Sequence, residues 1–369
     1  MKRLLTRSIA AILAAAMMLT GCASDDSSSA KDSTSSAAES ITDSSAADTS
    51  SDAPTSDESA EADSKSKDDS SDDNKQPSSI TPLMWEITSS KGNKMTLIGS
   101  MHALKDDAYP LPQFIMDAYN NSDVLAVECD VKEAQNDLSL QLSQVDKMFY
   151  SDGSTVDAHI GTEMYNNIVA FAERCGSNLS IYNRCKPWAL ISLLESFTMN
   201  KTDLKSNNGF DIFLLSKAHD DNKEIFEIES AKFQMDLFTS LSDEMCLQLL
   251  DGYKPQNYEL LVKNLEDTYT AWCKGDLKFF ENNLDVDASA KAAEASGNKM
   301  DEKSIEMLNQ YNQIMVYDRN KVMADKAAEL LESGKNVLFV VGAAHFPGDK
   351  GIIKLLEQKG YTVTQTSPK

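Results

Sequence analysis

A long tract with almost no apolar side chains limits what this chain can fold into. Residues 23 to 80 consist mostly of Ser, Asp, Ala, Thr and Lys, and they carry 15 acidic and 4 basic side chains, so about half of the formal net charge of −23 lies here. Such a segment cannot offset the entropy that it would lose on ordering. We therefore expect a disordered spacer, extended by its like charges, followed by one folded domain at residues 81–369.

The residues before this tract predict secretion and a lipid anchor. A basic start precedes an apolar run from Ser8 to Leu19, which is too short for a spanning helix with ordinary flanks. This pattern is typical of a signal peptide, here residues 1–21. The sequence LTGC, which ends at Cys22, resembles the lipobox of bacterial lipoproteins. That resemblance implies a lipid on Cys22 and a place at the extracytoplasmic face of the cell membrane. A plain signal peptide that happens to contain a cysteine is the simpler alternative.

The folded part is long enough for one large core, or for one core with an inserted helical lobe. It is acidic and has no basic stripe interleaved with aromatic side chains, which argues against nucleic acid as a partner. No apolar run after residue 19 is long enough to cross a bilayer. Five cysteines follow Cys22 without a C-x-x-C motif. Cys175 and Cys185 are near enough in sequence for a disulfide in an oxidising exterior, and free buried thiols are the alternative.

Strand patterns occur at both ends of the domain. Residues 82–100 read as two strands around a Lys-Gly-Asn turn, and residues 123–130 as a buried strand after a helix. Near the C-terminus, residues 336–345 form another short apolar run, followed by a helix and a closing strand. Between these ends the pattern is mainly helical, with one strand at 223–230. The helices that we expect there are 160–175, 187–199, 210–219, 230–240, 256–274 and 303–333. The order predicts an α/β fold, in which the N- and C-terminal segments form one mixed sheet around a large helical insertion.

Two of the four histidines stand in the same local pattern. His102 follows the apolar run MTLIG, and His345 follows VLFVVG, so that each lies three residues after a glycine, Gly99 or Gly342. Glu128 closes a third apolar run, DVLAV. Ligands of open α/β sheets bind beyond the carboxyl ends of the strands. If the three strands are neighbours, these three ionisable side chains should therefore project into one crevice.

This trio has a recognisable chemistry. Two neutral imidazoles and a carboxylate are the ligand set of many hydrolytic zinc sites, with an open position for water. The same trio could work without a metal, with one histidine as general base and the carboxylate orienting it. Water is the expected nucleophile in both cases, because no serine or cysteine stands in a nucleophile motif and Ser100 reads as a turn residue. Gly99 and Gly342 are predicted to let the backbone turn sharply or to let a ligand approach closely.

Other ionisable residues leave alternatives open. His159 and His219 are expected to be ordinary exposed histidines. Arg319 could hold a substrate carboxylate or stabilise an oxyanion, or it could form a salt bridge with Glu229 or Asp211. Glu229 could be a further ligand or a carboxylate beside the ligands. Alternatively it is only the N-terminal acid of the next helix.

Segments along the whole domain resemble a known family. In chain order they are LIGSMHAL, AYNNSDVLAVECD, NNGFDIFLLSKAH, EIFEIESAKFQ and YDRNKVMADKAAELLESGKNVLFVVGAAHFPGDKGIIKLLEQKGYTV. Together they resemble the TraB/GumN family, which includes pheromone-shutdown proteins and is similar to the TIKI metalloproteases. The resemblance implies a fold similar to that of the erythromycin esterase and ChaN-like proteins, and divalent-metal-dependent peptidase activity.

The family's motifs fall on particular residues here. Its two G-x-x-H motifs and its intervening glutamate fall on the two histidines and the glutamate described above. Its Arg-Asn element falls on Arg319 and Asn320, with Asp318 at a position that is often glutamate. Its Leu-Glu element, written Ile-Glu in this chain, falls on Glu229, and Gln234 follows.

We therefore expect a surface-anchored hydrolase that depends on a divalent metal, Mn, Co or Zn, and acts on a peptide or another small extracellular substrate. His102, Glu128 and His345 would hold the ion, and Glu229 and Arg319 would complete the catalytic site. One alternative is a protein that captures a peptide signal without cleaving it. Another is a metal-free hydrolase that resembles the erythromycin esterase group.

Overall fold

The computed structural model describes residues 78–295 and 299–366. The predicted signal peptide, the lipidation site Cys22 and nearly all of the predicted spacer lie outside these residues, so those expectations stay predictions. No helix in the described part is both long and apolar enough to span a membrane.

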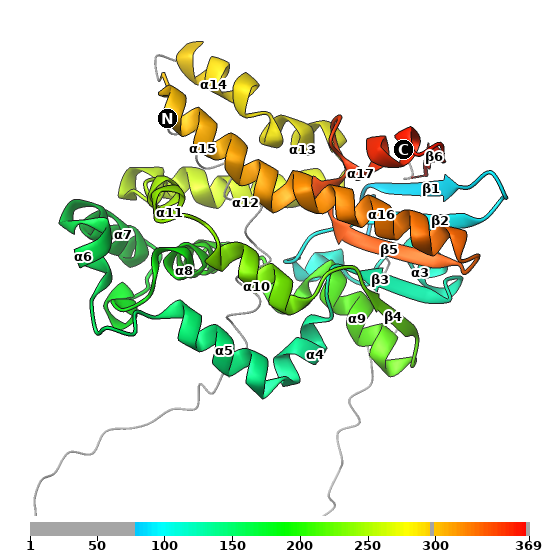
Figure 1. Ribbon diagram of the computed structural model, residues 1–369, viewed down its shortest axis with the longest axis horizontal. Coiled ribbons are helices and arrows are strands. Elements are labelled where there is room, and N and C mark those ends of the chain that lie inside the picture. Colours follow the sequence, from blue (N-terminus) through cyan, green and yellow to red (C-terminus); the bar gives the residue numbers. More distant parts are fainter. Residues whose placement is uncertain (1–77, 296–298, 367–369) are drawn as a thin grey trace, which may run out of the picture. The chain divides into compact units, whose positions relative to one another are not determined.

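A mixed sheet lies in the domain, and both ends of the domain contribute to it (Figure 1). Within the described residues its strands are β1 (Met84–Thr88), β2 (Lys94–Ser100), β3 (Val124–Val127), β4 (Glu224–Glu227), β5 (Val337–Gly342) and β6 (Thr362–Gln365). Their order is β4-β3-β5-β2-β1-β6. The four strands from β4 to β2 are parallel, and β1 and β6 are antiparallel to their neighbours. The predicted α/β fold is thus confirmed.

The apolar runs of the sequence become the inner strands. Every residue of β3 is buried, and so are all residues of β5 except Gly342. Parallel strands of this kind need cover on both faces. Helix α9 (Phe210–Asp220) packs on β3 and β4, and helix α16 (Asp318–Glu332) packs on β5 and crosses in front of the sheet in Figure 1. Helices α3 (Gln113–Asn120) and α17 (Ile352–Gln358) complete the sheet region.

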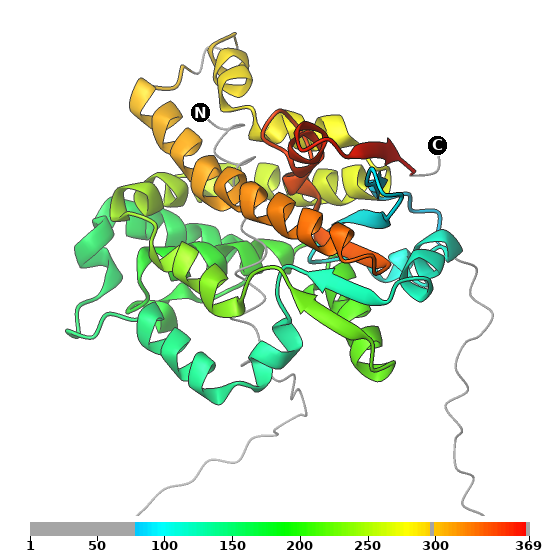
Figure 2. The same ribbon diagram turned by 45° about the vertical axis from the view of Figure 1, so that its right-hand side comes forward.

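The remaining helices form most of the predicted insertion (Figure 2). They are α4 (Val131–Asn136), α5 (Leu138–Met148), α6 (Val156–Ile160), α7 (Thr162–Arg174), α8 (Pro187–Met199), α10 (Ala231–Thr239), α11 (Asp243–Leu250), α12 (Tyr258–Cys273), α13 (Leu277–Leu284), α14 (Val286–Ala295) and α15 (Glu302–Asn312). Short 3-10 turns lie at η3 (Asp106–Ala108), η4 (Leu179–Tyr182), η5 (Ser206–Asn208), η6 (Pro255–Asn257) and η8 (Ala343–His345). The expected helices are all present, with bounds shifted by a few residues.

One expected helix differs in a way that matters for the site. The segment predicted as a single helix at 303–333 is α15, a π-helical turn η7 (Gln313–Tyr317) and α16. A π-helical turn inside an α-helix is rare and occurs often at functional sites. Here it ends two residues before Arg319, and the Met315 carbonyl within it accepts a hydrogen bond from Arg319 Nη1 at 3.0 Å.

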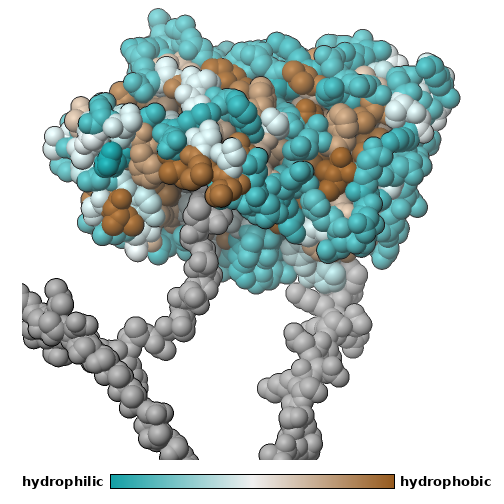
Figure 3. All heavy atoms as spheres, turned by 60° about the horizontal axis from the view of Figure 1, so that its bottom comes forward, coloured by the Kyte–Doolittle hydropathy of each residue, from teal (hydrophilic) through white to brown (hydrophobic). Residues whose placement is uncertain are grey.

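The insertion has a hydrophobic core of its own, separate from the core around the sheet. Cys175 and Cys185 are buried in it as free thiols, so the free-thiol alternative is the one observed. Few large apolar side chains are exposed among the described residues; three of them, Leu138, Leu142 and Val145, lie on α5. In Figure 3, small apolar patches on one face are separated by hydrophilic residues.

The core of the insertion also contains buried polar groups without hydrogen-bond partners in the described protein. They are both carboxylate oxygens of Glu195 and the hydroxyls of Ser192, Tyr253 and Tyr311. Burial raises the pKa of Glu195 well above its ordinary value. The folded protein therefore retains a proton that the unfolded chain releases above about pH 4.5, so this group lowers stability as the pH rises.

We expect Glu195→Gln to stabilise the protein at pH 8, and this gain to shrink as the pH falls toward 4. The gain arises because the amide carries no proton that the unfolded chain would release at pH 8. Urea unfolding at several pH values measures it. Glu173→Gln, at an exposed position of α7, is the matched control and should leave the pH dependence unchanged. Equal pH profiles for wild type and Glu195→Gln would contradict the assignment.

Candidate active site

The carboxyl ends of the four parallel strands deliver the predicted side chains to one edge of the sheet. Glu128 directly follows β3, His102 lies two residues beyond β2, Glu229 two residues beyond β4, and His345 three residues beyond β5. A cavity of about 70 Å³ at this edge is lined by His102, Glu128, His345 and also Arg319. The predicted meeting of the two G-x-x-H segments with Glu128 is therefore what the fold produces.

Arg319 lies at the centre of the polar contacts. Its Nε and Nη2 donate to the two oxygens of Glu229, each at 2.8 Å, and its Nη2 also donates to Glu128 Oε2 at 2.6 Å. All three side chains are more than nine-tenths buried. The salt-bridge alternative for Arg319 is thus confirmed for Glu229 and wrong for Asp211, which lies beside His102 instead. Glu229 acts as a partner of Arg319, and the helix after it is capped by Ser230.

The Glu128 carboxylate is held on both oxygens. Oε1 accepts from the Gly342 backbone N–H at 2.7 Å, and Oε2 accepts from Arg319 and from Gln234 Nε2, the latter at 3.0 Å. Burial works to raise the pKa of Glu128, but Arg319, together with protonated His102 and the Gly342 N–H, holds it well below its ordinary value. Glu128 is therefore ionised over the whole physiological range.

Gln234, on α10, links the two carboxylates. Its Nε2 donates to Glu128 Oε2 and to Glu229 Oε2, both at 3.0 Å, while its Oε1 accepts from the Cys129 thiol at 3.3 Å. That thiol contact fixes which end of the amide faces the carboxylates. Burial raises the pKa of Cys129 well above its ordinary value, so the thiol stays protonated and can donate.

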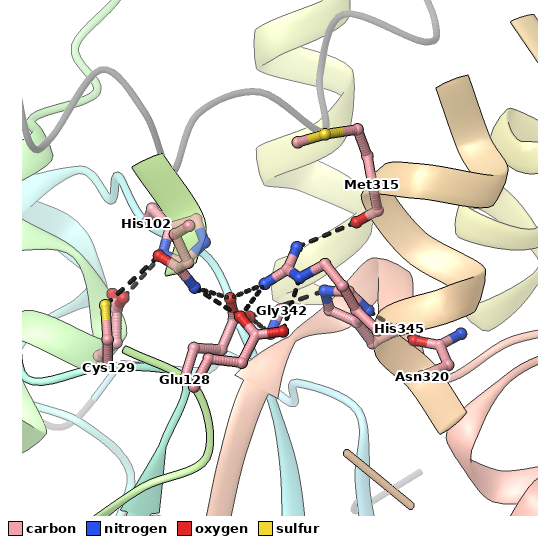
Figure 4. Close-up of polar contacts among 11 residues, drawn as sticks. His102, Glu128, Cys129, Met315, Asn320, Gly342 and His345 are labelled. Carbon is pink, nitrogen blue, oxygen red and sulfur yellow. Dashed lines mark hydrogen bonds and ion pairs between the residues drawn. The ribbon is translucent and has the colours of Figure 1, made fainter. Parts of the chain in front are cut away.

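His345 is a neutral imidazole with one nitrogen anchored. Asn320 Nδ2 donates to the Lys350 carbonyl at 2.8 Å, which turns its Oδ1 toward His345 Nδ1 at 2.6 Å (Figure 4). An amide oxygen only accepts, so the proton of the ring sits on Nδ1 and the lone pair on Nε2. Burial, reinforced by Arg319, lowers the pKa of His345 to about 3. Its Nε2 lies 3.8 Å from Glu128 Oε1.

His102 is anchored in the same manner by a residue that the sequence patterns did not assign to the site. Its Nδ1 lies 2.7 Å from Asp211 Oδ2. Gly209 makes this approach possible, because a Cβ there would lie 2.5 Å from the His102 carbonyl oxygen. The start of α9 therefore rests against the His102 backbone and brings Asp211 to the ring. The segment NNGFD, whose glycine precedes the acid, is the signal that could have pointed to it.

The electrostatics of this pair lead to a pH-dependent prediction for the metal-free protein. Burial lowers the pKa of His102, but the Asp211 carboxylate outweighs burial and raises it to about 9. Stability from this pair is complete below the unfolded value of 6.5 and is lost as the pH rises through about 9. Asp211→Asn should bring the titration of His102 down to pH 6.5 or below and remove this loss, as ring NMR signals and urea unfolding can measure.

A matched control is available in the second His–Asp pair. Asp130 Oδ2 lies 2.7 Å from His219 Nε2, and His219 is exposed. Asp130→Asn should leave the titration of His102 unchanged. A His102 signal that titrates alike in wild type and Asp211→Asn would contradict the assigned cause. His159, the fourth histidine, is exposed as expected and stacks on Tyr150.

The glycines of the two motifs serve close packing, and Gly342 is also the residue at which the chain leaves β5 for the turn η8. Neither Gly99 nor Gly342 has a positive φ. A Cβ on Gly99 would lie 3.1 Å from Ala343 Cβ, so this glycine lets two segments of the chain approach each other. A Cβ on Gly342 would lie 3.3 Å from Glu128 Oε1, so this one admits the carboxylate. Ser100 is also not a turn residue, because it ends β2 and lines the cavity.

The donor set fits a divalent ion in its chemistry. Metal-bound imidazoles almost always donate their other N–H to an oxygen, as His102 does to Asp211 and His345 to Asn320. No hydrogen bond occupies His102 Nε2 among the described residues. The three donors do not converge on one point, however. In the described part, no group of three His, Cys, Asp or Glu side chains is arranged to hold a metal. Figure 4 shows His102 and His345 on either side of Glu128.

The rest of the cavity wall was not predicted from the sequence. Apolar side chains from η7 and α13 close it, including Met315, Val316 and Phe280. A larger groove of about 510 Å³ lies between α4, α5 and α10, and none of the predicted site residues lines it. The small cavity is thus the place where the predicted groups meet.

Comparisons with known proteins give one family and several distant relatives. The family model described as TraB/PrgY/gumN family matches residues 83–365. The chain is 26% identical over 166 residues to the uncharacterized protein YbaP of Escherichia coli K12, covering 45% of this chain and 59% of that protein. It is 28% identical over 197 residues to the metalloprotease TIKI homolog of Amphimedon queenslandica, with 50% and 38% of the two chains covered.

A further relative is metalloprotease TIKI2 of Danio rerio, at 24% identity over 196 residues, which cover 51% of this chain and 38% of that protein. The chain thus spans about half the length of the curated relatives that it matches. No solved structure matches it at a significant level.

Proposed function

Because this chain belongs to the TraB/PrgY/gumN family, we propose that it is a divalent-metal-dependent hydrolase that cleaves peptides. The observation that carries the proposal is the pair of imidazoles, each anchored through Nδ1, on either side of the Glu128 carboxylate at one sheet edge. Relatives named as metalloproteases, which match about half of this chain, support a metal.

His102 and His345 would hold the ion through Nε2, with Glu128 Oε1 as the third donor. A divalent ion in such a site supplies Lewis acidity and a water of lowered pKa. His345 is suited to this role because it is neutral. His102 must first release its proton, and the excess of negative charge favours replacement of that proton by a divalent cation. Among the described residues, the carboxylates of Glu128, Glu229 and Asp211 face two cations, Arg319 and protonated His102.

Arg319 would orient both the carboxylate and the substrate. Four of its five N–H groups are used by Glu128, Glu229 and the Met315 carbonyl. One N–H on Nη1 remains, and Arg319 lines the cavity. A fixed donor at this place can bind the oxygen that becomes negative when a carbonyl is attacked by water.

We also propose that the enzyme works outside the cytoplasm, anchored to the membrane through a lipid on Cys22. The basic start, the apolar run and the LTGC sequence support this. Labelling cells with a radioactive fatty acid tests it, with Cys22→Ser as the control that should not be labelled. The substrates would be peptides or other small molecules on that side of the membrane.

The hydrolase proposal is tested on the purified full-length protein with a mixture of peptides. We expect cleavage after addition of Mn²⁺, Co²⁺ or Zn²⁺, loss of cleavage with a chelator, and recovery when the metal is restored. Metal content measured by mass spectrometry should approach one ion per chain. Cleavage that survives complete chelation would instead indicate a metal-free hydrolase.

A second candidate, binding of a peptide without cleavage, is favoured by one observation. Both oxygens of Glu128 already accept hydrogen bonds, and no three donors converge within the described residues. Under this alternative the same assay gives stoichiometric capture of a peptide and no products with any of the metals.

A further inference from the structure

The site cavity has two chemically different walls. His102, Glu128, Arg319 and His345 supply the polar wall. The other wall is made of the side chains of Met101, Phe280, Met315 and Val316, all of them buried. Thr268 also lines it, but its hydroxyl donates to the Asn264 carbonyl at 2.7 Å and is therefore already engaged. These apolar side chains line the same cavity as the charged ones, and they have no part in holding an ion.

The size of the cavity limits what can occupy the apolar side. Its volume is about 70 Å³. An apolar protein cavity of about 150 Å³ accommodates a benzene ring, so this one has about half of that room. A group of a few carbon atoms fits beside the apolar wall, whereas an aromatic side chain does not.

We propose that this wall is a specificity pocket that takes one small aliphatic side chain, of alanine to valine size, from a peptide bound at the site. The inference rests on the proposed function, because it places the peptide bond to be cleaved next to the polar wall. A polar or charged side chain would be excluded, since it would lose water without gaining a partner at Met101, Phe280 or Val316.

Phe280 has the largest side chain among the four apolar residues of this wall, so we expect it to limit the size of the pocket. It lies on α13, and its ring contacts that of Phe279 edge to face, with centroids 5.6 Å apart. Phe279 is only partly buried and does not line the cavity. These two neighbouring phenylalanines therefore provide a test residue and a control of equal size on the same helix.

The test uses the full-length protein and the blocked peptides acetyl-Gly-Gly-Xaa-Gly-Gly-amide, with Xaa as Gly, Ala, Val, Leu or Phe, in the presence of Mn²⁺, Co²⁺ or Zn²⁺. Wild type should prefer Ala and Val over Phe at least about 10-fold in kcat/KM, because one extra or missing methylene group in a hydrophobic pocket already changes kcat/KM about 10–200-fold. Phe280→Ala should reduce that preference at least about 10-fold, and Phe279→Ala should not change it. Phe280→Leu, which disturbs folding less, should lie in between.

Cleavage with the same side-chain preference in wild type, Phe280→Leu and Phe280→Ala would overturn the pocket while leaving the hydrolase in place. If wild type cleaves none of these five peptides, calorimetric binding of the same peptides decides about the pocket, while the peptide mixture decides about the hydrolase. The pocket is supported if wild type binds the Phe peptide more weakly than the Ala and Val peptides and if Phe280→Ala binds the Phe peptide more tightly than wild type does. Equal binding of all peptides, or binding of none, overturns it.

Discussion

Replacing Arg319 by methionine is expected to lower the free energy of unfolding by about 3–5 kcal/mol, because it leaves two buried carboxylates without their cation. Glu128 and Glu229 both accept from this guanidinium and are almost inaccessible to water. After the replacement, Gln234 would still donate to both carboxylates, but as a neutral amide it brings no positive charge. Urea unfolding at pH 7 measures the loss, provided that the unfolding is two-state.

The pH dependence gives this prediction a second readout. Because the pKa of Glu128 is held low in the folded wild type, its ion pair contributes stability above the unfolded value of 4.5 that is lost as the pH falls. In Arg319→Met the sign reverses, since buried carboxylates without a cation are easier to accommodate when protonated. The variant should therefore recover part of its deficit between pH 7 and 5, and Glu229→Gln should restore part of it at pH 7.

A surface arginine provides the control. Arg174 pairs with Glu259, and both side chains are largely exposed. Pairs of this kind contribute about 0–1 kcal/mol, so Arg174→Met should cost no more than that. Similar losses for Arg174→Met and Arg319→Met would show that the buried network does not have the strength assigned to it.

The central part of the site followed from the sequence because strand ends are encoded locally. Short apolar runs predict buried strands, and the carboxyl ends of parallel neighbours must share one edge. His102, Glu128 and His345 could therefore be placed together without knowledge of any contact. The sheet was predictable for the same reason, since the runs at both ends of the domain had to find partners.

The groups that anchor the site were harder to predict, because helices outside the sheet carry them. Asp211 reaches His102 only because Gly209 lets α9 rest against the backbone, and Gln234 reaches Glu128 from α10. Whether Arg319 would meet Glu229 or Asp211 depended on how α16 crosses the sheet, which no local pattern encodes. The π-helical turn before Arg319 and the apolar wall at Phe280 likewise arise from tertiary packing.

The largest effect on activity is expected from the two site histidines. His102→Ala and His345→Ala should each abolish metal binding and lower kcat/KM at least about 100-fold, up to about 10⁴-fold. His345 is neutral, so His345→Ala leaves no buried charge unpaired and should remain folded. His102→Ala removes the partner of the Asp211 carboxylate, so urea unfolding at pH 7 is measured beside activity for this variant, and Asp211→Asn/His102→Ala restores the charge balance. Mass spectrometry of the metal content and peptide cleavage measure the two effects separately.

The hydrogen-bond partner of His345 distinguishes a functional imidazole from a structural one. Asn320 holds Nδ1 and leaves Nε2 toward Glu128. Replacing such a partner typically costs about 10–100-fold in metal affinity, so Asn320→Ala should lie between wild type and His345→Ala in both readouts. His159→Ala, at the exposed histidine, should equal wild type. If His345 only fills space, Asn320→Ala would alter stability but leave metal affinity unchanged, and the graded order of the three variants would not appear.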